Sequence, residues 1–305
     1  MKSGAPPEVL VLLATYNGEA WLEEQLLTIF AQRNVKVRVV ASDDGSADRS
    51  TALLERSAPA HDLRLLQSRS STGSAAGNFR RLIQEAPLDR ADFIAYADQD
   101  DVWDADKLHR AVLALEESGA AGYSSRVRAV WPGGRILTVG PSSKSLPGDF
   151  LFEGAGQGCT FVMRRAAFKR VRHAIERHAE LAERMEFHDW MTYVVFRTGG
   201  EPWVFDPEPS LDYRQHEGNS LGSRGGWGPA RRRLSLLRNG WFQGQMDAAY
   251  DMAKTIDPEL PELARFLRAR RSGGLAWLRY LATRSRRRRF DRAVLVAAAF
   301  AGWLR

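Results

Sequence analysis

The sequence predicts an α/β fold in which a Rossmann-like, mostly parallel sheet is flanked by helices and followed by a helical C-terminal extension. Uncharged or weakly charged apolar runs of strand length alternate with segments of helical periodicity through the first hundred residues. This alternation is typical of parallel strands joined by right-handed helical crossovers. After residue 222 the composition changes to basic segments with helical periodicity. We therefore divide the chain into a domain of residues 1–222 and an extension of residues 223–305.

Four segments rich in aliphatic and β-branched residues are predicted strands. Between them, the spacing of apolar residues predicts helices over residues 20–32, 48–56 and 78–85, and a fourth helix after residue 104. Asp48 and Asp104 are the predicted N-caps of the second and fourth helices. The predicted strands are residues 9–14, 35–41, 63–67 and 93–97.

Polar residues follow three of these strands, at the edge where open α/β sheets bind ligands. The first strand runs into residues 15–18, the second into residues 42–46, and the fourth into Asp98, Asp100 and Asp101. Clustered carboxylates raise each other's pKa unless a cation lies among them, and hard oxygen ligands suit Mg²⁺ or Mn²⁺. The pattern indicates a metal–diphosphate site. The alternative is a solvated acidic loop that caps the next helix.

The middle of the chain contains turn-rich segments. Residues 122–140 form a predicted hairpin around a turn at residues 132–134. Residues 154–163 are glycine-rich and run into a strand, but they lack the lysine and hydroxyl residues of a P-loop. Their glycines either permit close backbone approach to a ligand or begin a bulged strand.

Composition limits the class of protein. The chain has 305 residues, a formal net charge of +7 and 44% apolar residues, so a sizeable core is available. Cys159 is the single cysteine, which excludes a disulfide framework and is compatible with a reducing cytoplasm. The first residues lack the basic and apolar run of a signal peptide, and no window is long enough for a transmembrane helix. We therefore expect a cytoplasmic protein.

The extension carries much of the positive charge, in clusters at residues 231–233, 268–271 and 284–289 beside apolar helical faces. This combination suits peripheral contact with the anionic inner face of the cell membrane, at about 1 kcal/mol per basic residue near the surface. The alternative is a solvated basic face that serves as a homo-oligomer contact. No nucleic acid is expected, because the aromatic residues are not interleaved with the basic ones.

Three motifs in order resemble the family 2 glycosyltransferases, which are inverting enzymes with a GT-A fold that use nucleotide-diphospho-sugars. The motifs are residues 13–17 (LATYN), residues 43–48 (DDGSAD) and residues 98–103 (DQDDVW). The resemblance covers roughly residues 8–220 and points to the rhamnosyltransferase-like branch of bacterial surface-polysaccharide assembly. It implies a nucleotide-sugar half over about residues 8–120 and an acceptor half over about residues 121–222.

The resemblance implies nucleotide and metal contacts at the strand ends. Tyr16 would stack on the base, Asp44 would accept a hydrogen bond from the ring N–H of uracil or thymine, and Asp43 would lie on the ribose side. Asp100 would coordinate the metal directly, whereas Asp101 would support the site from behind or cap the next helix. The implied nucleotide-binding residues are Thr15, Tyr16, Asn17, Asp43, Asp44 and Asp98, and the implied metal ligands are Asp100, Asp98 and His216.

The resemblance also implies the chemistry of the acceptor side. Asp189, in the segment FHDW, would be the general base that takes the proton of the acceptor hydroxyl. The alternative is that Asp189 caps a helix that begins at Trp190. In the segment YRQH, Arg214 would clamp the diphosphate, and His216 would ligate the metal or contact the diphosphate. The implied diphosphate or acceptor contacts are Arg214, His188, Trp190 and Gly158.

These assignments imply a metal-dependent, non-processive glycosyltransferase with Mg²⁺ or Mn²⁺ as its cofactor. It would move a sugar from a UDP- or dTDP-sugar, with dTDP-rhamnose as one candidate, to a hydroxyl of a glycan or lipid-linked acceptor in cell-surface polysaccharide synthesis. A sugar nucleotidyltransferase is an alternative, although residues 15–18 do not supply its glycine-rich, basic first loop. A non-catalytic nucleotide-sugar or membrane-binding module is another, and it predicts that Asp189 can be lost without loss of function.

Overall fold

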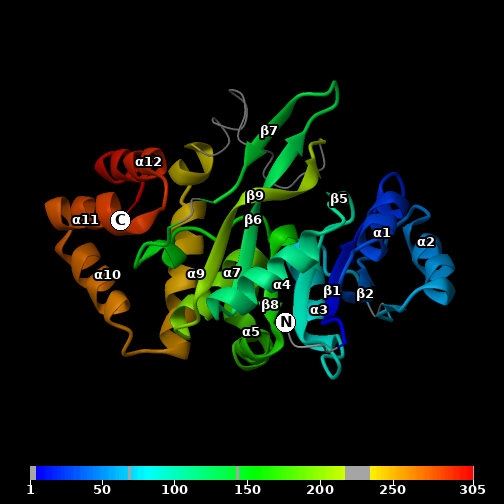
Figure 1. Ribbon diagram of the computed structural model, residues 1–305. Coiled ribbons are helices and arrows are strands. Elements are labelled where there is room, and N and C mark those ends of the chain that lie inside the picture. The colour runs from blue at the N-terminus through cyan, green and yellow to red at the C-terminus, as the bar shows by residue number, and fades with distance from the viewer. Residues whose placement is uncertain (1–4, 68–69, 142–143, 217–233, 305) are drawn as a thin grey trace.

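The computed structural model describes residues 5–67, 70–141, 144–216 and 234–304 (Figure 1). A mixed sheet lies at its centre, with strands in the order β3-β2-β1-β4-β8-β6-β9-β5 and with β7 paired to β6. Helices flank this sheet, and the C-terminal helices α10, α11 and α12 lie at the end of the molecule opposite α1 and α2 (Figure 1). The predicted α/β class with a helical C-terminal extension is confirmed.

The first half of the sheet is parallel, as predicted. β1 is central in this half and pairs with β2 on one side and β4 on the other, while β3 extends the sheet beyond β2. The register pairs Thr15 with Asp43, so the carboxyl ends of β1 and β2 lie side by side. The strands are β1 (Glu8–Thr15), β2 (Lys36–Asp43), β3 (Leu63–Leu65) and β4 (Phe93–Ala97).

The two faces of β1 belong to two different cores, because successive side chains of a strand point to opposite faces. Val9, Val11 and Leu13 share a core with α1, α2 and α4, whereas Leu10 and Leu12 share a core with α3 and the helices of the second half. The edge that carries the polar loops is thereby held between two helical layers. These helices are α1 (Leu22–Phe30), α2 (Ser50–Ser57), α3 (Ala75–Glu85) and α4 (Lys107–Ser118).

Both predicted N-caps are wrong, because α2 and α4 each begin further along the chain than predicted. The residue directly before α2 is Arg49, although the Asp48 carboxylate accepts from the Ser50 N–H (2.9 Å) and hydroxyl (2.6 Å) and from the Glu19 N–H (3.0 Å). The Asp104 carboxylate pairs with both terminal nitrogens of Arg128 on β6 (2.6 and 3.0 Å). A bidentate, charge-assisted pair is stronger than a single cap bond. The tertiary partner therefore decides where Asp104 points.

The second half of the sheet is mixed. β8 runs antiparallel to β4 and β6, and β5 runs antiparallel to β9, whereas β6 and β9 are parallel. β6 and β7 form the predicted hairpin. A hairpin and a loop join β6, β7 and β8, so no helical crossover imposes a parallel direction there. These strands are β5 (Val102–Trp103), β6 (Gly122–Val130), β7 (Ile136–Val139), β8 (Val162–Arg164) and β9 (Trp203–Arg214).

Three helices of the second half cover the sheet face that α3 also covers. Two short 3₁₀ turns, Asp149–Leu151 and Gly158–Thr160, lie in the chain between β7 and β8. The second turn belongs to the glycine-rich stretch of residues 154–163 that was predicted to run into a strand, and that strand is β8. The helices are α5 (Arg165–Arg177), α6 (Ala179–Arg184) and α7 (His188–Thr198).

The extension packs on the domain and shares its core. α9 packs against α6 and α7, and the Phe152 ring lies among the rings of Phe266, Trp277 and Tyr280. The predicted boundary at residue 222 and the basic cluster at residues 231–233 fall outside the described residues. Within those residues, no helix is long and apolar enough to cross a membrane. The extension comprises α9 (Trp241–Ile256), α10 (Pro261–Ser272), α11 (Gly274–Tyr280), a π-helical turn (Leu281–Ser285) and α12 (Arg289–Phe300).

Candidate active site

Hydrogen bonds between polar side chains join the ends of β1 and β2. The Thr15 hydroxyl donates to the Asp43 carboxylate (2.9 Å), and both residues are buried. The same carboxylate accepts from the N–H groups of Gly45 (3.1 Å) and Ser46 (2.8 Å). Asp43 therefore shapes the turn after β2. The nucleotide contacts assigned to Thr15 and Asp43 stay predictions.

Gln99 ties the loop after β1 to the loop after β4. The Tyr16 N–H donates to Gln99 Oε1 (2.7 Å), and Gln99 Nε2 donates to the Tyr16 carbonyl (2.8 Å). A Cβ on Gly18 would lie 2.3 Å from Gln99 Oε1, so this contact requires glycine. The Tyr16 side chain is left exposed at 56%. It is thus accessible for the predicted stacking on a base.

Two asparagines bridge the ends of β1 and β2. The Asn17 N–H donates to the Ser46 hydroxyl (2.8 Å), with Asn17 in the left-handed region at φ +47°. Asn78, buried on α3, donates from its amide to the carbonyls of Thr15 (3.2 Å) and Ser42 (2.8 Å). Sequence reasoning missed Asn78. Its signal was a polar residue on the apolar face of an amphipathic helix.

Asp44 binds the loop that precedes α3. Its carboxylate accepts from the N–H groups of Thr72 (2.6 Å) and Gly73 (3.0 Å) and from the Ser71 hydroxyl (3.3 Å), and Arg81 lies 3.8 Å away. A carboxylate offers about four acceptor positions, so capacity for a base N–H remains. The predicted contact of Asp44 with the base therefore stays a prediction. The structure adds that Asp44 orders residues 71–73.

Asp98, Asp100 and Asp101 lie together after β4, and burial changes their protonation. Burial raises the pKa of Asp98 to about 8, and the charges of Asp100 and Asp189 act in the same direction. Burial also raises the pKa of Asp101, which is fully buried, well above its usual value. Among the described residues, neither Asp101 oxygen has a hydrogen-bond partner. A cation among these carboxylates would relieve both effects.

The donor set fits a hard divalent cation. Ligand atoms of Asp98, Asp101 and Cys159 lie within 4.8 Å of one another. Carboxylate oxygens suit Mg²⁺ and Mn²⁺, whereas a thiol suits softer metals. Burial holds the pKa of Cys159 well above its usual value, so the thiol stays protonated. Asp101 is thus a candidate oxygen donor to such a cation, whereas the sequence analysis placed it only in a supporting role.

β9 brings Arg214 and His216 to this cluster, because β5 and β9 pair beside the loop after β4. His216 Nε2 lies 2.6 Å from Asp100 Oδ2, and its ring stacks on Trp21 with the centroids 4.3 Å apart. Arg214 donates to the Asp100 carbonyl (3.4 Å) and pairs with Glu24. The alternation of Arg214 and His216 predicted a common side, and both side chains contact Asp100. Their roles toward a metal or a diphosphate stay predictions.

A buried lysine stands behind the carboxylates, and sequence reasoning missed it. Lys107 is fully buried at the start of α4, with Nζ 3.5 Å from the centroid of the Trp103 ring. Burial lowers the pKa of Lys107 to about 8, and nearby negative charges, Asp101 among them, oppose this shift. A lysine in a helix first turn usually indicates a solvated position. Only the tertiary structure places Lys107 near the carboxylate cluster.

Asp189 lies in the first turn of α7, near enough to Asp98 for its charge to raise the pKa of Asp98. Its carboxylate accepts from the Trp190 N–H (2.6 Å). Burial raises the pKa of Asp189 to about 6, while the N–H groups of Trp190 and Gly158 hold it down. α7 begins one residue before Asp189, so the alternative of an N-cap before Trp190 is wrong. A carboxyl whose pKa lies near neutrality suits a general base.

His188 and Gly158 form the walls around Asp189. The His188 ring stacks on Phe79 with the centroids 3.6 Å apart. Burial, with the nearby charge of Arg80, lowers the pKa of His188 to about 3, so the imidazole is neutral. A Cβ on Gly158 would lie 2.7 Å from His188 Nε2 and 3.2 Å from Asp189 Cβ, so this close approach requires glycine.

Trp190 is a packing residue in this structure. Its side chain is buried, and its indole N–H donates to the Phe150 carbonyl (2.8 Å). Its ring stacks on Phe242 of the extension. The contact with an acceptor or diphosphate that was assigned to Trp190 stays a prediction.

The fold and the site together define a GT-A glycosyltransferase: a parallel sheet edge with ordered loops, a carboxylate cluster after β4, and a separate half-buried carboxyl on α7. The chain matches Glycosyl transferase family 2 over residues 10–172. The chain therefore belongs to glycosyl transferase family 2, and it is an enzyme that transfers a glycosyl group.

One relative agrees with this family assignment, and two solved structures agree with the fold. The chain is 36% identical over 236 residues to dTDP-rhamnosyl transferase RfbG from Shigella flexneri, which is 77% of this chain and 82% of the relative. It is similar in fold to S. aureus TarS 1-349 in complex with UDP-GlcNAc, with a TM-score of 0.54, 14% identity and coverage of 97% and 92% of the two chains. It is also similar to the mannosyltransferase PcManGT from Pyrobaculum calidifontis in complex with GDP-Man and Mn²⁺, with a TM-score of 0.52, 18% identity and coverage of 97% and 85%.

Proposed function

We propose that this glycosyltransferase is inverting, metal-dependent and non-processive. It would move a sugar from a UDP- or dTDP-sugar to a hydroxyl of a glycan or lipid-linked acceptor in cell-surface polysaccharide synthesis. The observation that carries the proposal is the position of Asp189, a half-buried carboxyl with a raised pKa that lies within electrostatic reach of Asp98. Inversion requires one base near the anomeric carbon of the donor, on the face opposite the leaving group.

A dTDP-sugar, with dTDP-rhamnose as the first candidate, is the donor that we propose. The support is the 36% identical relative, whose name gives a dTDP-rhamnosyl transferase. The exposed ring of Tyr16 would stack on the base, and Asp44 would accept the N–H of the thymine or uracil ring. A neighbour in fold binds UDP-GlcNAc, so a UDP-sugar is the other candidate.

Mg²⁺ or Mn²⁺ is the cofactor that we propose, and Asp98, Asp100 and His216 would hold it. The support is the carboxylate cluster, in which burial raises the pKa values of Asp98 and Asp101, and a neighbour in fold that is in complex with Mn²⁺. When bound, such a cation neutralises the diphosphate of the donor and stabilises its departure. Arg214, beside Asp100, would bind the same diphosphate.

The transfer itself would proceed in one displacement at the anomeric carbon. The Asp189 carboxylate takes the proton of the acceptor hydroxyl as that oxygen attacks. The bond from the anomeric carbon to the diphosphate breaks, and its electron pair leaves with the nucleotide diphosphate. The neutral His188 ring supplies no positive charge that would stabilise the ionised form of Asp189, which is consistent with the raised pKa of that carboxyl.

Nucleotide diphosphates test the donor assignment by thermal stability. A ligand that binds only the folded state adds about 2.7 kcal/mol at a hundredfold excess over its Kd. We expect dTDP or UDP to raise the unfolding midpoint in the presence of Mn²⁺ and to do so much less after chelation, with GDP as the control nucleotide. Stabilisation by GDP alone, or without any metal, would contradict the proposed site.

We also propose a peripheral contact between the extension and the anionic inner face of the membrane. The support is three exposed apolar side chains, Leu275, Phe290 and Phe300, which are 83%, 78% and 85% exposed. Basic residues beside an exposed apolar surface suit an anionic lipid surface. Arg286 and Arg287 supply less of this charge than the sequence indicated, because both bind carbonyls or carboxylates of the domain.

Vesicle flotation tests this contact. Replacing Phe290 and Phe300 together by serine should reduce flotation with vesicles that contain anionic lipid, because about 2 kcal/mol of burial is lost for each ring. Turnover with a water-soluble acceptor should be unchanged. Equal flotation of the variant and the wild type would remove the proposal.

A further inference from the structure

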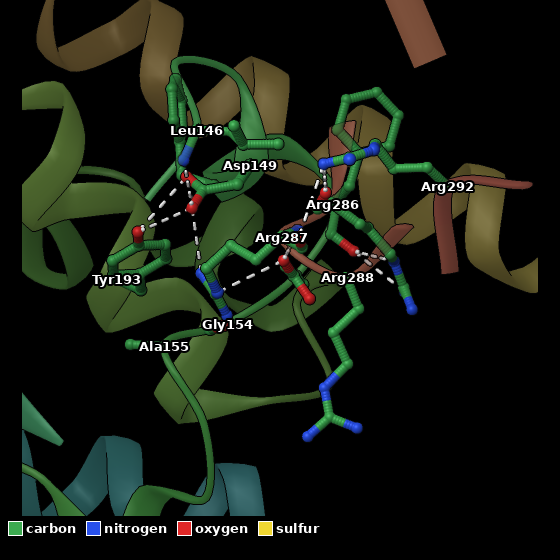
Figure 2. A network of polar contacts seen from close by, with 12 residues as sticks. Leu146, Asp149, Gly154, Ala155, Tyr193, Arg286, Arg287, Arg288 and Arg292 are labelled. Carbon is green, nitrogen blue, oxygen red and sulfur yellow. Dashed lines mark hydrogen bonds and ion pairs between the residues drawn. The ribbon is translucent and has the colours of Figure 1, made fainter. Parts of the chain in front are cut away.

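Two consecutive arginines of the extension, Arg286 and Arg287, bind residues of the domain (Figure 2). The next residue, Arg288, donates to the Gly140 carbonyl. The basic run at residues 284–289 indicated a solvated or membrane-facing surface. Instead, the Arg287 side chain is only 3% exposed. Its partners lie more than 130 residues earlier in the chain, in the stretch from Asp149 to Gly154.

Asp149 is the centre of this network and is fully buried. Its carboxylate pairs with Arg287 (3.0 Å) and with Arg197 (2.6 Å), and it accepts from the Tyr193 hydroxyl (3.1 and 3.2 Å). Figure 2 shows Asp149 between Tyr193 and Arg287. Arg197 and Tyr193 belong to α7, the helix that carries Asp189 in its first turn. The buried charge therefore links the extension to α7 as well as to the 3₁₀ turn at Asp149.

Arg286 and Arg287 also hold the backbone that follows Asp149. Arg286 donates to the Phe152 carbonyl (3.0 and 3.2 Å). Arg287 donates to the Gly154 carbonyl, and its own N–H donates to the Glu153 carboxylate (2.6 Å). Two adjacent arginines thus hold three successive residues of the domain. Arg292 completes the arrangement by donating to the Arg286 carbonyl (2.9 Å).

The segment that Arg286 and Arg287 bind, residues 152–154, lies beside the helix turn that carries Asp189. A Cβ on Gly154 would lie 3.2 Å from the Trp190 backbone, so Gly154 rests against the first turn of α7. The Ala155 carbonyl accepts from the Ser124 hydroxyl (2.8 Å). Four residues after Gly154, the Gly158 N–H acts on the Asp189 carboxylate and lowers its pKa. Residues 149–158 therefore form one wall of the Asp189 site, and its far end is held by Arg287.

We propose that Arg287 is a positioning residue of the glycosyl transfer, and that the C-terminal extension completes the active site by holding residues 149–158 against α7. This inference rests on the proposed role of Asp189 as the base. A guanidinium suits the position because its planar fork can bond Asp149 and the Gly154 carbonyl at once. A lysine at residue 287 would keep the charge that Asp149 requires but would lose one of these two bonds.

Arg287→Lys tests the inference, with Arg289→Lys as the matched control. Arg289 stands two residues away in the same basic run and is exposed. The measured quantity is kcat per nucleotide-binding site. Titration with dTDP or UDP in Mn²⁺ gives the number of folded sites in each preparation. We expect Arg287→Lys to lower kcat per site at least tenfold, with the nucleotide Kd within twofold of wild type. We expect Arg289→Lys to match wild type in both.

A second pair of variants separates positioning from folding. Arg287→Gln should lower kcat per site further than Arg287→Lys, because it also removes the charge. Arg286→Lys, which concerns a half-buried side chain bound to the Phe152 carbonyl, should fold even if the Arg287 variants do not, and should lower kcat per site about threefold. Nucleotide binding should persist in both, because the contacts of the network lie in the acceptor half.

The outcomes separate the two proposals. A wild-type kcat per site in Arg287→Lys or in Arg286→Lys overturns the positioning role. A variant that has fewer nucleotide-binding sites but normal turnover at each remaining site overturns it too, because only folding is then affected. Full activity of Asp189→Asn overturns the proposed base and leaves the arginine network as a structural clamp only. Loss of activity in Asp189→Asn together with normal Arg287→Lys turnover overturns this inference alone.

Discussion

Replacing Asp189 by asparagine is expected to lower kcat by about 10²–10⁴-fold, which is the range that general base catalysis contributes. The amide keeps the size of the carboxylate and still accepts the Trp190 N–H, but it cannot take a proton at neutral pH. Binding of dTDP or UDP should be unchanged, because the side chain lies on α7 and not in the loops after β1 and β2. Steady-state kinetics and nucleotide titration measure the two quantities.

Two controls make this result specific. Glu180→Gln, at an exposed carboxylate on α6, should leave turnover unchanged. Burial raises the pKa of Asp189 to about 6, so the ionised base is lost as the pH falls, and wild-type kcat should decline below about pH 6. Near-normal turnover of Asp189→Asn would instead favour another base or a non-catalytic module.

The raised pKa of Asp189 also determines whether this carboxyl stabilises or destabilises the folded protein at a given pH. The folded-state pKa of Asp189, about 6, lies above the ordinary value of 3.8 for an aspartic acid. Its contribution to folding is therefore complete below about pH 3.8 and is lost as the pH rises through about 6. At pH 7.5 the ionised carboxylate opposes folding, so Asp189→Asn should not lower the unfolding midpoint. A loss of activity in that variant is then not a loss of fold.

Replacing Asp100 by alanine is expected to remove metal-dependent nucleotide binding. The change deletes an oxygen donor of the cluster and leaves His216 without the carboxylate that lies 2.6 Å from its Nε2. We expect nucleotide diphosphate in Mn²⁺ to bind about 100-fold more weakly or worse, which corresponds to about 2.8 kcal/mol at 1.4 kcal/mol per tenfold. Isothermal calorimetry with dTDP or UDP, in Mn²⁺ and after chelation, measures this loss.

Asp106→Asn is the matched control for Asp100→Ala. Asp106 is an exposed carboxylate six residues further along the chain, and its side chain makes no capping hydrogen bond to α4. The Asp106→Asn variant should bind the nucleotide diphosphate with the same affinity as the wild type. Unchanged, metal-stimulated binding in Asp100→Ala would refute the assignment of Asp100 as a ligand and would transfer the role to Asp98 and Asp101.

Sequence reasoning succeeded where a signal is local. The apolar runs of β1, β2 and β4 predicted buried strands, and parallel pairing then required their carboxyl ends to meet at one edge. The alternation of Arg214 and His216 predicted that both would point to one side, and both contact Asp100. Each of these conclusions uses residues a few positions apart.

Sequence reasoning failed where the partner is distant. Asp104 looked like an N-cap because the helix after it is close in sequence, but Arg128 on β6 binds it instead. Asn78 looked like an ordinary helix residue, but its amide binds the carbonyls of Thr15 and Ser42 at the ends of β1 and β2. The burial of Lys107 likewise has no local signal. A pattern of charged residues in the sequence does not predict which residue of opposite charge will lie beside each of them in the fold.

The sequence by itself determined the α/β class, the parallel first half of the sheet, and the family to which the acidic motifs belong. These depend on periodicity and on short motifs, which act within a few residues. The tertiary structure alone decided that Asp189 lies within a helix near Asp98, and that Arg287 is buried against Asp149, 138 residues away. Burial strengthens the interaction within such a pair, because two opposite charges attract each other more strongly in the low dielectric of the protein interior than in water.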